Sequence, residues 1–349
     1  MAILYAGDSA GRYDGSFLAL GEAMRRRDFI KVVAGSSVAW PLTVHAQSQL
    51  KVLRVGAVFP APRSRPQWQA LEHRLSDLGY RDGANYIMDY VKIPRVAEAD
   101  YKTEYLKLME RHADIIVSGG PEISLRAAIA TVGTRPIVMV AIDYDPLDRG
   151  YVESLAHPGG NVTGVFLQQI ELAEKRVQVL LEAFPDIRAA TVFWDPVSTD
   201  QWKATQLAAQ KLGLKLASIE FRKQPYDYEA ALVQAPPDHR DALIVLTSPA
   251  LVSDRSQLSE FAIKHRMRSM GVAREYADAG CLLTYGANLA EMYARAADYI
   301  DRLAKGTFPA DLPIEQPTKF ELVVNLKTAK ALGISLSPAL IARADQVIE

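Results

Sequence analysis

The stretch VLRVGAVF at residues 52–59, continued by PAPRSRPQWQALEHRLSDLG at residues 60–79, sets the plan of the fold. The first part is almost wholly apolar and stops at Pro60, which is typical of a buried strand. Apolar side chains then recur at spacings of three, four and three residues, at Trp68, Leu71, Leu75 and Leu78. This spacing predicts one face of a helix that ends at Gly79. The stretch therefore predicts a strand followed by a helix.

The same alternation of short apolar runs and helical segments continues along the chain, which indicates βαβ units and parallel sheets. It forms two successive series, so we expect two α/β lobes. A first crossing between them is expected near residues 164–168 and a return crossing near 281–286. The further strands that the pattern predicts are 86–91, 114–118, 137–142, 161–167, 190–194, 215–221, 242–246, 270–273, 282–285 and 320–326.

The N-terminal region has the pattern of an export signal. Arg25-Arg26-Arg27 precedes the modestly apolar segment 29–44, and Val44-His45-Ala46 offers small residues for cleavage. This predicts a twin-arginine-type signal at 24–46 and a mature chain that starts near Gln47. The apolar part is too short and too polar for a permanent anchor. A buried helix at a domain edge is the alternative.

The 23 residues before Met24 show no basic cluster and no clear period. We expect Met24 to be the true start, with 1–23 a non-native or disordered extension. A ragged N-terminal extension is the alternative.

Composition excludes several classes of function. The chain has 349 residues with 40 Lys+Arg and 41 Asp+Glu, a net charge of −1. This balance gives no electrostatic footprint for nucleic acid and no polybasic membrane patch. The single cysteine, Cys281, cannot form an intrachain disulfide, so stability must come from the core.

Polar and aromatic side chains follow the predicted strands, where parallel sheets bind their ligands. Polar groups at helix N-termini can receive a carboxylate, and the aromatic rings of Tyr144, Trp194 and Tyr276 could sandwich a planar ligand. Ser, Thr and Asp at such positions are also ordinary helix caps. The candidate ligand-binding residues are Trp68, Ser118, Gly119, Glu122, Asp143, Asp145, Trp194, Ser198, Thr199, Thr247, Ser248 and Tyr276.

Signals for catalysis are weak. The sequence has no G-x-S-x-G, no P-loop and no G-x-G-x-x-G after a strand. No histidine has a partner at a metal-binding spacing. We therefore expect a protein that is not an enzyme and that uses no cofactor and no metal.

Three motifs resemble those of a large family of ABC-transporter substrate-binding proteins. SLAHPGGNVTG at 154–164 resembles the signature S-L-A-x-P-G-G-N-x-T-G, and residues 312–333 are similar to the family's C-terminal signature. LLTYG at 282–286 is similar to its return-crossing motif. The resemblance implies an α/β fold of the type-I periplasmic-binding class, with two Rossmann-like lobes and parallel sheets joined by three crossing strands. It implies a first lobe of 51–164 and 287–315, and a second of 165–286 and 316–349.

The resemblance implies a periplasmic solute-binding component of an ABC importer. Such a protein binds a small polar or aromatic ligand, an amino acid or an aromatic acid, by hinge closure, and delivers it to a membrane permease; we expect a monomer. Some members bind aromatic amino acids. The basic, proline-rich loop at 60–66 makes an anionic ligand an alternative. A sensory module that reports to a membrane receptor is the alternative function.

Overall fold

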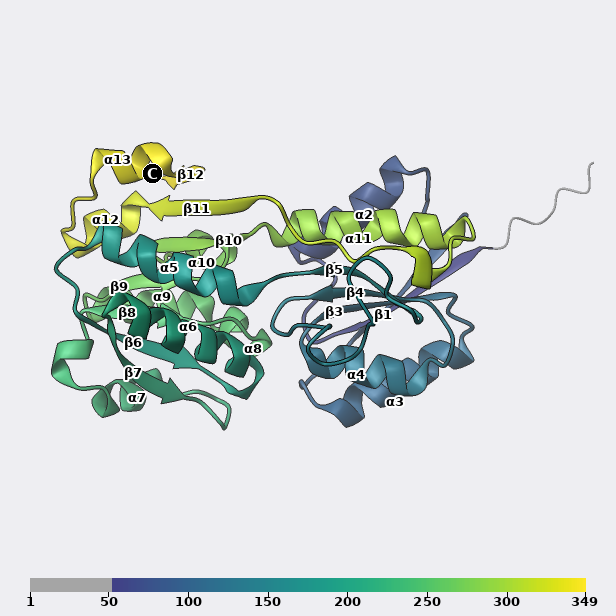
Figure 1. Cartoon of the computed structure of the whole chain (residues 1–349), viewed down its shortest axis with the longest axis horizontal. Coiled ribbons are helices and arrows are strands. Elements are labelled where there is room, and N and C mark those ends of the chain that lie inside the picture. Colours follow the sequence, from purple (N-terminus) through teal and green to yellow (C-terminus); the bar gives the residue numbers. More distant parts are fainter. Residues whose placement is uncertain (1–51) are drawn as a thin grey trace, which may run out of the picture. The chain divides into compact units, whose positions relative to one another are not determined.

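The structure, a computed structural model, describes residues 52–349 except the side chains of 169–171. Figure 1 shows its helices and strands. The predicted export signal at 24–46 and the extension at 1–23 lie outside the described residues. Within residues 52–349 the strands form two sheets, one of five strands and one of seven.

The first sheet is parallel throughout, with strand order β2-β1-β3-β4-β5. Its central strands are buried along their whole length, as expected for a parallel sheet with both faces covered. The apolar run at residues 52–59 forms the strand β1 of this sheet. The strands are β1 (Leu53–Phe59), β2 (Tyr86–Lys92), β3 (Ile115–Gly120), β4 (Ile137–Ala141) and β5 (Val162–Phe166).

Helices cover both faces of this sheet (Figure 1). One face carries α2 (Pro66–Asp77) and α11 (Leu289–Ala304), which also pack against each other. The other carries α3 (Glu98–Glu110) and α4 (Glu122–Thr131). Helix α11 lies far from α2 in the sequence, so the chain returns to this sheet after building most of the second one. We call the first sheet with these helices the first lobe.

The second sheet has the order β12-β11-β10-β9-β8-β6-β7, and its neighbours are parallel except for the pair β10–β11. With its helices it forms the second lobe, which has one large apolar core. The strands are β6 (Ala189–Trp194), β7 (Lys215–Glu220), β8 (Ala242–Val245), β9 (Arg268–Gly271), β10 (Leu283–Ala287), β11 (Phe320–Asn325) and β12 (Gln346–Ile348).

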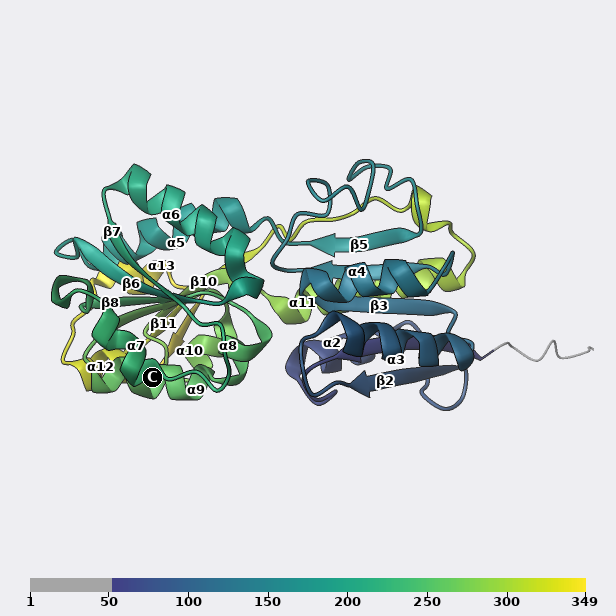
Figure 2. The same ribbon diagram turned by 90° about the horizontal axis from the view of Figure 1, so that it is seen from below.

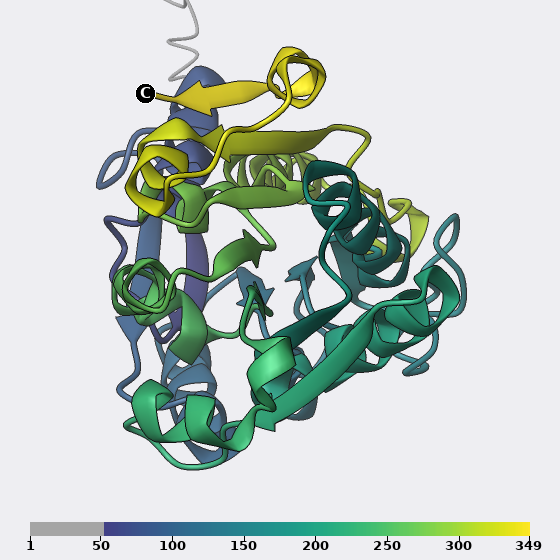
Figure 3. The same cartoon turned by 90° about the vertical axis from the view of Figure 1, so that its left-hand side faces the viewer.

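Helices lie on both sides of the second sheet (Figures 2 and 3). Helices α5 and α6 pack against each other, and α9 contacts α7, α10 and α12. The helices are α5 (Gln169–Ala183), α6 (Thr199–Leu212), α7 (Tyr228–Gln234), α8 (Pro249–Ser253), α9 (Arg255–Lys264), α10 (Arg274–Asp278), α12 (Leu326–Leu332) and α13 (Pro338–Arg343), with short 3-10 turns at Pro196–Ser198, Pro237–His239 and Pro309–Asp311.

The chain passes between the sheets three times: from β5 to α5, from β10 to α11, and from the turn at Pro309–Asp311 to β11. The first passage begins at Leu167, inside the range that the sequence predicts. The return begins only after Ala287, because pairing of Ala287 with Phe320 holds β10 in the second sheet to its end. The predicted lobe boundaries remain a prediction.

Gly164 lies on β5, at the end of the SLAHPGGNVTG motif. Its φ is +134°, in the region that side chains rarely adopt, and a Cβ built on it would stand 2.1 Å from the backbone oxygen of Met139 on β4. Glycine thus lets β4 and β5 pair closely just before the chain leaves the first lobe.

Short elements account for most differences from the sequence-based expectation. Helices α8 and α9 are separated at Asp254, whose backbone departs from helical geometry (φ −89°, ψ 6°). Helices α7, α10 and α13 and strand β12 were not predicted. Each has three to seven residues, too few for a periodic pattern to show.

No helix within residues 52–349 is both long enough and apolar enough to cross a membrane.

Candidate ligand-binding site

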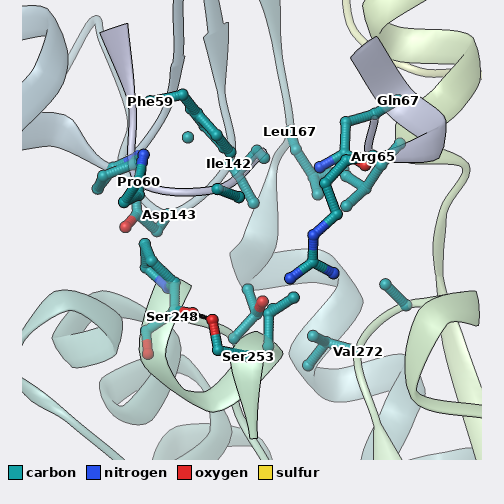
Figure 4. Close-up of a pocket in the computed structure, with 18 of the residues that line it drawn as sticks. Phe59, Pro60, Arg65, Gln67, Ile142, Asp143, Leu167, Ser248, Ser253 and Val272 are labelled. Atoms are coloured by element: carbon teal, nitrogen blue, oxygen red, sulfur yellow. Dashed lines mark hydrogen bonds between the residues drawn. The ribbon is translucent and has the colours of Figure 1, made fainter. Parts of the chain in front are cut away.

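A cavity lies where strand ends of the two sheets face each other (Figure 4). The first lobe contributes residues that follow β1, β3 and β4, and the second lobe contributes residues that follow β8 and β9. The passages between the lobes add Leu167, Ala287 and Leu289. The free space, which includes the open mouth of the cavity, is about 780 Å³.

The walls of the cavity are mainly apolar. Phe59, Ile142 and Leu167 lie on one side and Val272 lies on the other (Figure 4). Among the described residues that line the cavity, Phe59 is the one aromatic. Such walls can bury the apolar body of a ligand, while a few polar groups fix its orientation.

Asp143 is the carboxylate of the first lobe in this cavity. It follows β4, its side chain is buried, and its Oδ1 has no hydrogen-bond partner among the described residues. Burial raises the pKa of Asp143 well above its ordinary value, and the carboxylates of Glu122 and Asp195 add to the shift, although backbone N–H groups oppose it. A buried oxygen without a partner is costly unless a ligand supplies a donor. Asp143 is therefore suited to bind an amine.

The polar wall of the second lobe is held in place by a hydrogen-bond network. Ser248 donates its hydroxyl to Asp195 Oδ2 at 2.5 Å, and Tyr226 donates to the same oxygen at 3.1 Å. Gln201 binds the backbone of Thr247 in both directions, at 2.9 and 3.1 Å. These contacts fix the positions of Thr247 and Ser248 at the cavity before any ligand arrives.

Arg65 directly precedes α2, and its side chain reaches into the cavity (Figure 4). Within residues 52–349 its side chain has no hydrogen bond and no ion pair. Burial lowers the pKa of Arg65, and the like charge of Arg255 lowers it further, whereas Glu275 and Tyr90 raise it. A partly buried guanidinium without a partner is a candidate group for binding a carboxylate.

An ion pair joins the two lobes in a hollow next to the cavity, which Asp143 also borders. Arg149, in the loop after β4, binds Asp200 on α6 and also Glu122 at 3.1 Å. Tyr151 donates a hydrogen bond to Glu122 at 2.7 Å. This neighbouring hollow thus holds a network of charges rather than a single surface pair.

The structure brings together at the cavity only three of the predicted ligand residues, Asp143, Thr247 and Ser248. Glu122 and Thr199 line a neighbouring hollow, and Asp145 lines another; Asp143 borders both. The Oδ1 of Asp145 accepts the backbone N–H of Leu147 at 2.8 Å, as a turn cap does.

The remaining predicted residues lie outside the cavity lining. Trp68 is fully buried beneath it, in edge contact with Phe59 and Tyr90. Ser118 donates a hydrogen bond to Ser124 at 3.0 Å, and a Cβ at Gly119 would stand 2.2 Å from the hydroxyl of Tyr293.

In the second lobe, Ser198 caps a turn with Asp195. The ring of Trp194 stacks on Trp202 with centroids 5.6 Å apart, and Tyr276 is almost fully buried. The ring of Tyr144 is buried against Tyr151. The three rings expected to sandwich a planar ligand therefore pack within the protein.

Two kinds of lining residue were missing from the predicted set. Arg65 and Gln67 follow β1 and carry the same strand-end signal as Asp143, so the sequence could have identified them. Leu167, Ala287 and Leu289 are apolar and lie on the passages between lobes, where no sequence signal separates a cavity wall from a core residue.

Two α/β lobes are joined by three passages of the chain, and a cavity lies between their strand ends. These features define a two-lobed ligand-binding protein of the type-I periplasmic-binding fold. The family model of ABC transporter substrate binding proteins matches residues 62–348. The chain belongs to this family, whose members bind solutes and work with ABC transporter permeases.

Relatives agree with this assignment. A tyrosine-binding protein of Clostridioides difficile (strain R20291) is 24% identical over 266 residues, which cover 74% of each chain. A conserved domain protein from Vibrio cholerae has a similar structure, with a TM-score of 0.78, 24% identity and coverage of 85% of this chain and 100% of that one. An ABC domain from Streptococcus pneumoniae in complex with L-Trp has a TM-score of 0.74 and 21% identity, covering 85% and 99%. The two structures support the fold alone.

Proposed function

We propose that this protein is the periplasmic solute-binding component of an ABC importer. It binds a small ligand, an amino acid or an aromatic acid, in the cavity between its lobes and closes the lobes around it. The observation that carries this proposal is the single cavity to which Asp143 of the first lobe and Ser248 of the second both contribute.

Closure follows from contacts to both lobes. A ligand that touches both stabilises the arrangement in which they are close, and so shifts the population toward the closed state. The ion pair between Arg149 and Asp200, in the neighbouring hollow, adds a further contact between the lobes. Because this pair is partly exposed, it contributes about 1 kcal/mol or less, so the ligand is the main cause of closure.

Recognition of an amino acid uses the chemistry of the cavity. The amine of the ligand donates to Asp143, and its side chain lies against Phe59 and Ile142. This differs from stacking between two rings, because the other candidate rings pack within the protein. The tyrosine named for the relative from Clostridioides difficile supports an amino acid as the ligand.

The other parts of the proposal come from the sequence and the family. Export through the signal at 24–46, delivery to a membrane permease, a monomeric state and the absence of a nucleic-acid partner remain predictions. Family membership supports a location outside the cytoplasm and a permease partner.

Isothermal titration calorimetry of the purified protein tests the proposed ligand class. The protein is first unfolded and refolded to remove any ligand that co-purifies, and is then titrated with L-tyrosine, L-tryptophan, L-phenylalanine, L-leucine, benzoate and 4-hydroxybenzoate. We expect at least one of them to bind with a Kd of about 1 μM or below, roughly −8 kcal/mol. Absence of binding by all six at millimolar concentration would show that the proposed ligand class is wrong.

A further inference from the structure

The basic loop at residues 60–66 contains two arginines with different surroundings. Arg63 is paired within the first lobe, with Glu72 and with Asp82 at 2.8 Å, and these partners raise its pKa although burial opposes them. Arg65 has no such partner among the described residues and points into the cavity (Figure 4). The loop therefore holds one structural arginine and one that is free to bind a ligand.

The cavity is positively charged at the end where Arg65 lies. Across it, in the second lobe, Arg255 donates a hydrogen bond to the backbone oxygen of Val252, a lining residue, at 2.9 Å. Helix α2 also begins beside the cavity, since Gln67 in its first turn is a lining residue. The N-terminal end of a helix of this length favours an anion.

The nearby acidic group compensates this charge only in part. Glu275 lies close enough to Arg65 and Arg255 for both to lower its pKa, but burial outweighs them and raises it. Neither arginine forms an ion pair with Glu275 within residues 52–349. Figure 4 shows the side chains of Asp143 and Arg65 at separate places in the cavity. The cavity thus has separate basic and acidic groups.

We propose that Arg65 is the residue that recognises a carboxylate on the ligand, so that the site selects carboxylate-bearing solutes over their neutral analogues. This inference rests on the proposed function, because it concerns the same cavity. The guanidinium offers two parallel N–H donors to the two carboxylate oxygens. Asp143 receives the amine of the same ligand, and Arg255 adds positive potential from the opposite lobe. The selected class is a zwitterion, held by its two charged groups.

The test compares acids with their amides. L-tryptophan and L-leucine are titrated beside L-tryptophanamide and L-leucinamide, which keep the amine and the side chain but lack the carboxylate. The proteins are the wild type, Arg65→Gln and Arg63→Gln. Arg63→Gln is the matched control, because it makes the same change of charge in the same loop. We expect the wild type to prefer the acid about 10- to 100-fold, the usual contribution of a charged hydrogen-bonded pair.

In Arg65→Gln the affinity for the acid should fall about 10- to 100-fold and the ratio of acid to amide should approach one. Arg63→Gln should keep the wild-type ratio, and Arg65→Lys should keep part of it. A wild-type ratio near one, or a ratio that survives Arg65→Gln, would overturn the assignment of Arg65 and leave the proposed function standing. If Arg65→Gln loses affinity for the acid and for the amide equally, the assignment of Arg65 is also overturned, because equal losses indicate a structural role. If none of L-tyrosine, L-tryptophan, L-phenylalanine and L-leucine binds the wild type, both the assignment of Arg65 and an amino acid as the ligand are rejected.

Discussion

Gly164→Ala is expected to destabilise the folded protein by about 2–6 kcal/mol. Alanine at φ +134° adopts a strained backbone conformation, and its Cβ would overlap the backbone oxygen of Met139, 2.1 Å away. Backbone strain of this kind costs about 1–3 kcal/mol, and forcing extra atoms into a packed site costs a similar amount. Because the obstacle is backbone, relief requires β4 and β5 to separate. The free energy of unfolding in urea measures the effect.

The matched control is Gly160→Ala in the same motif. A Cβ at Gly160 has no atom within 4 Å, and its φ lies outside the region that side chains avoid. The control should therefore change stability by less than about 0.5 kcal/mol. Equal stability of the two variants would contradict the close pairing of β4 with β5.

Asp143→Asn is expected to weaken ligand binding and to stabilise the ligand-free protein at neutral pH. Loss of a charged hydrogen bond to the ligand's amine should lower affinity about 10- to 100-fold. Stability should rise because asparagine removes the cost of burying an ionised carboxylate whose Oδ1 has no partner. Such opposite effects are common where a binding site is built at the expense of stability.

The pH dependence gives this prediction a sign. The folded protein holds the pKa of Asp143 above its ordinary value of 3.8. Between pH 3.8 and the pKa in the folded protein, the folded state therefore binds the proton more tightly than the unfolded chain does. The stabilisation from the neutral carboxyl is fully present below pH 3.8 and is lost as the pH rises through the folded pKa. The difference in unfolding free energy between Asp143→Asn and the wild type should therefore grow with pH.

Asp148→Asn is the control for both measurements, ligand affinity and the pH dependence of the unfolding free energy. It makes the same change of charge in the same loop, but Asp148 is exposed. It should bind ligand like the wild type and show no such pH-dependent gain. An Asp143→Asn variant that binds the ligand with unchanged affinity would contradict the role of Asp143 in the site.

The architecture was predictable because it depends on hydrophobic periodicity, which the sequence shows directly. The run at 52–59 and the helical face from Trp68 to Leu78 reappear as β1 and α2. The convergence of strand ends was predictable for the same reason, since parallel strands place their carboxyl ends at one edge. Thr247 and Ser248 of the second lobe and Asp143 of the first indeed line one cavity.

The side chains that fill the core were harder to separate from those that line the site. Trp194 ends β6 and Tyr276 lies in α10, both near strand ends, yet stacking on Trp202 and burial take their rings out of the cavity. A strand-end position fixes where the backbone lies but not where a side chain points. Orientation depends on neighbours in other elements: Trp194 stacks on Trp202 of α6 and donates its indole N–H to Ser218 of β7 at 2.8 Å.

The distance between the lobes, with and without ligand, tests the central claim of ligand-driven closure most directly. Spin labels at Leu106→Cys on α3 and Val233→Cys on α7 report it, because both positions are exposed, one in each lobe. Cys281 should stay unlabelled, since it is buried and burial raises the pKa of its thiol to about 11. Pulsed electron–electron double resonance should give one short distance between the two labels when the protein is saturated with an amino acid that binds. Without ligand it should give a longer and broader distance distribution. Identical distributions in the two samples would contradict the account.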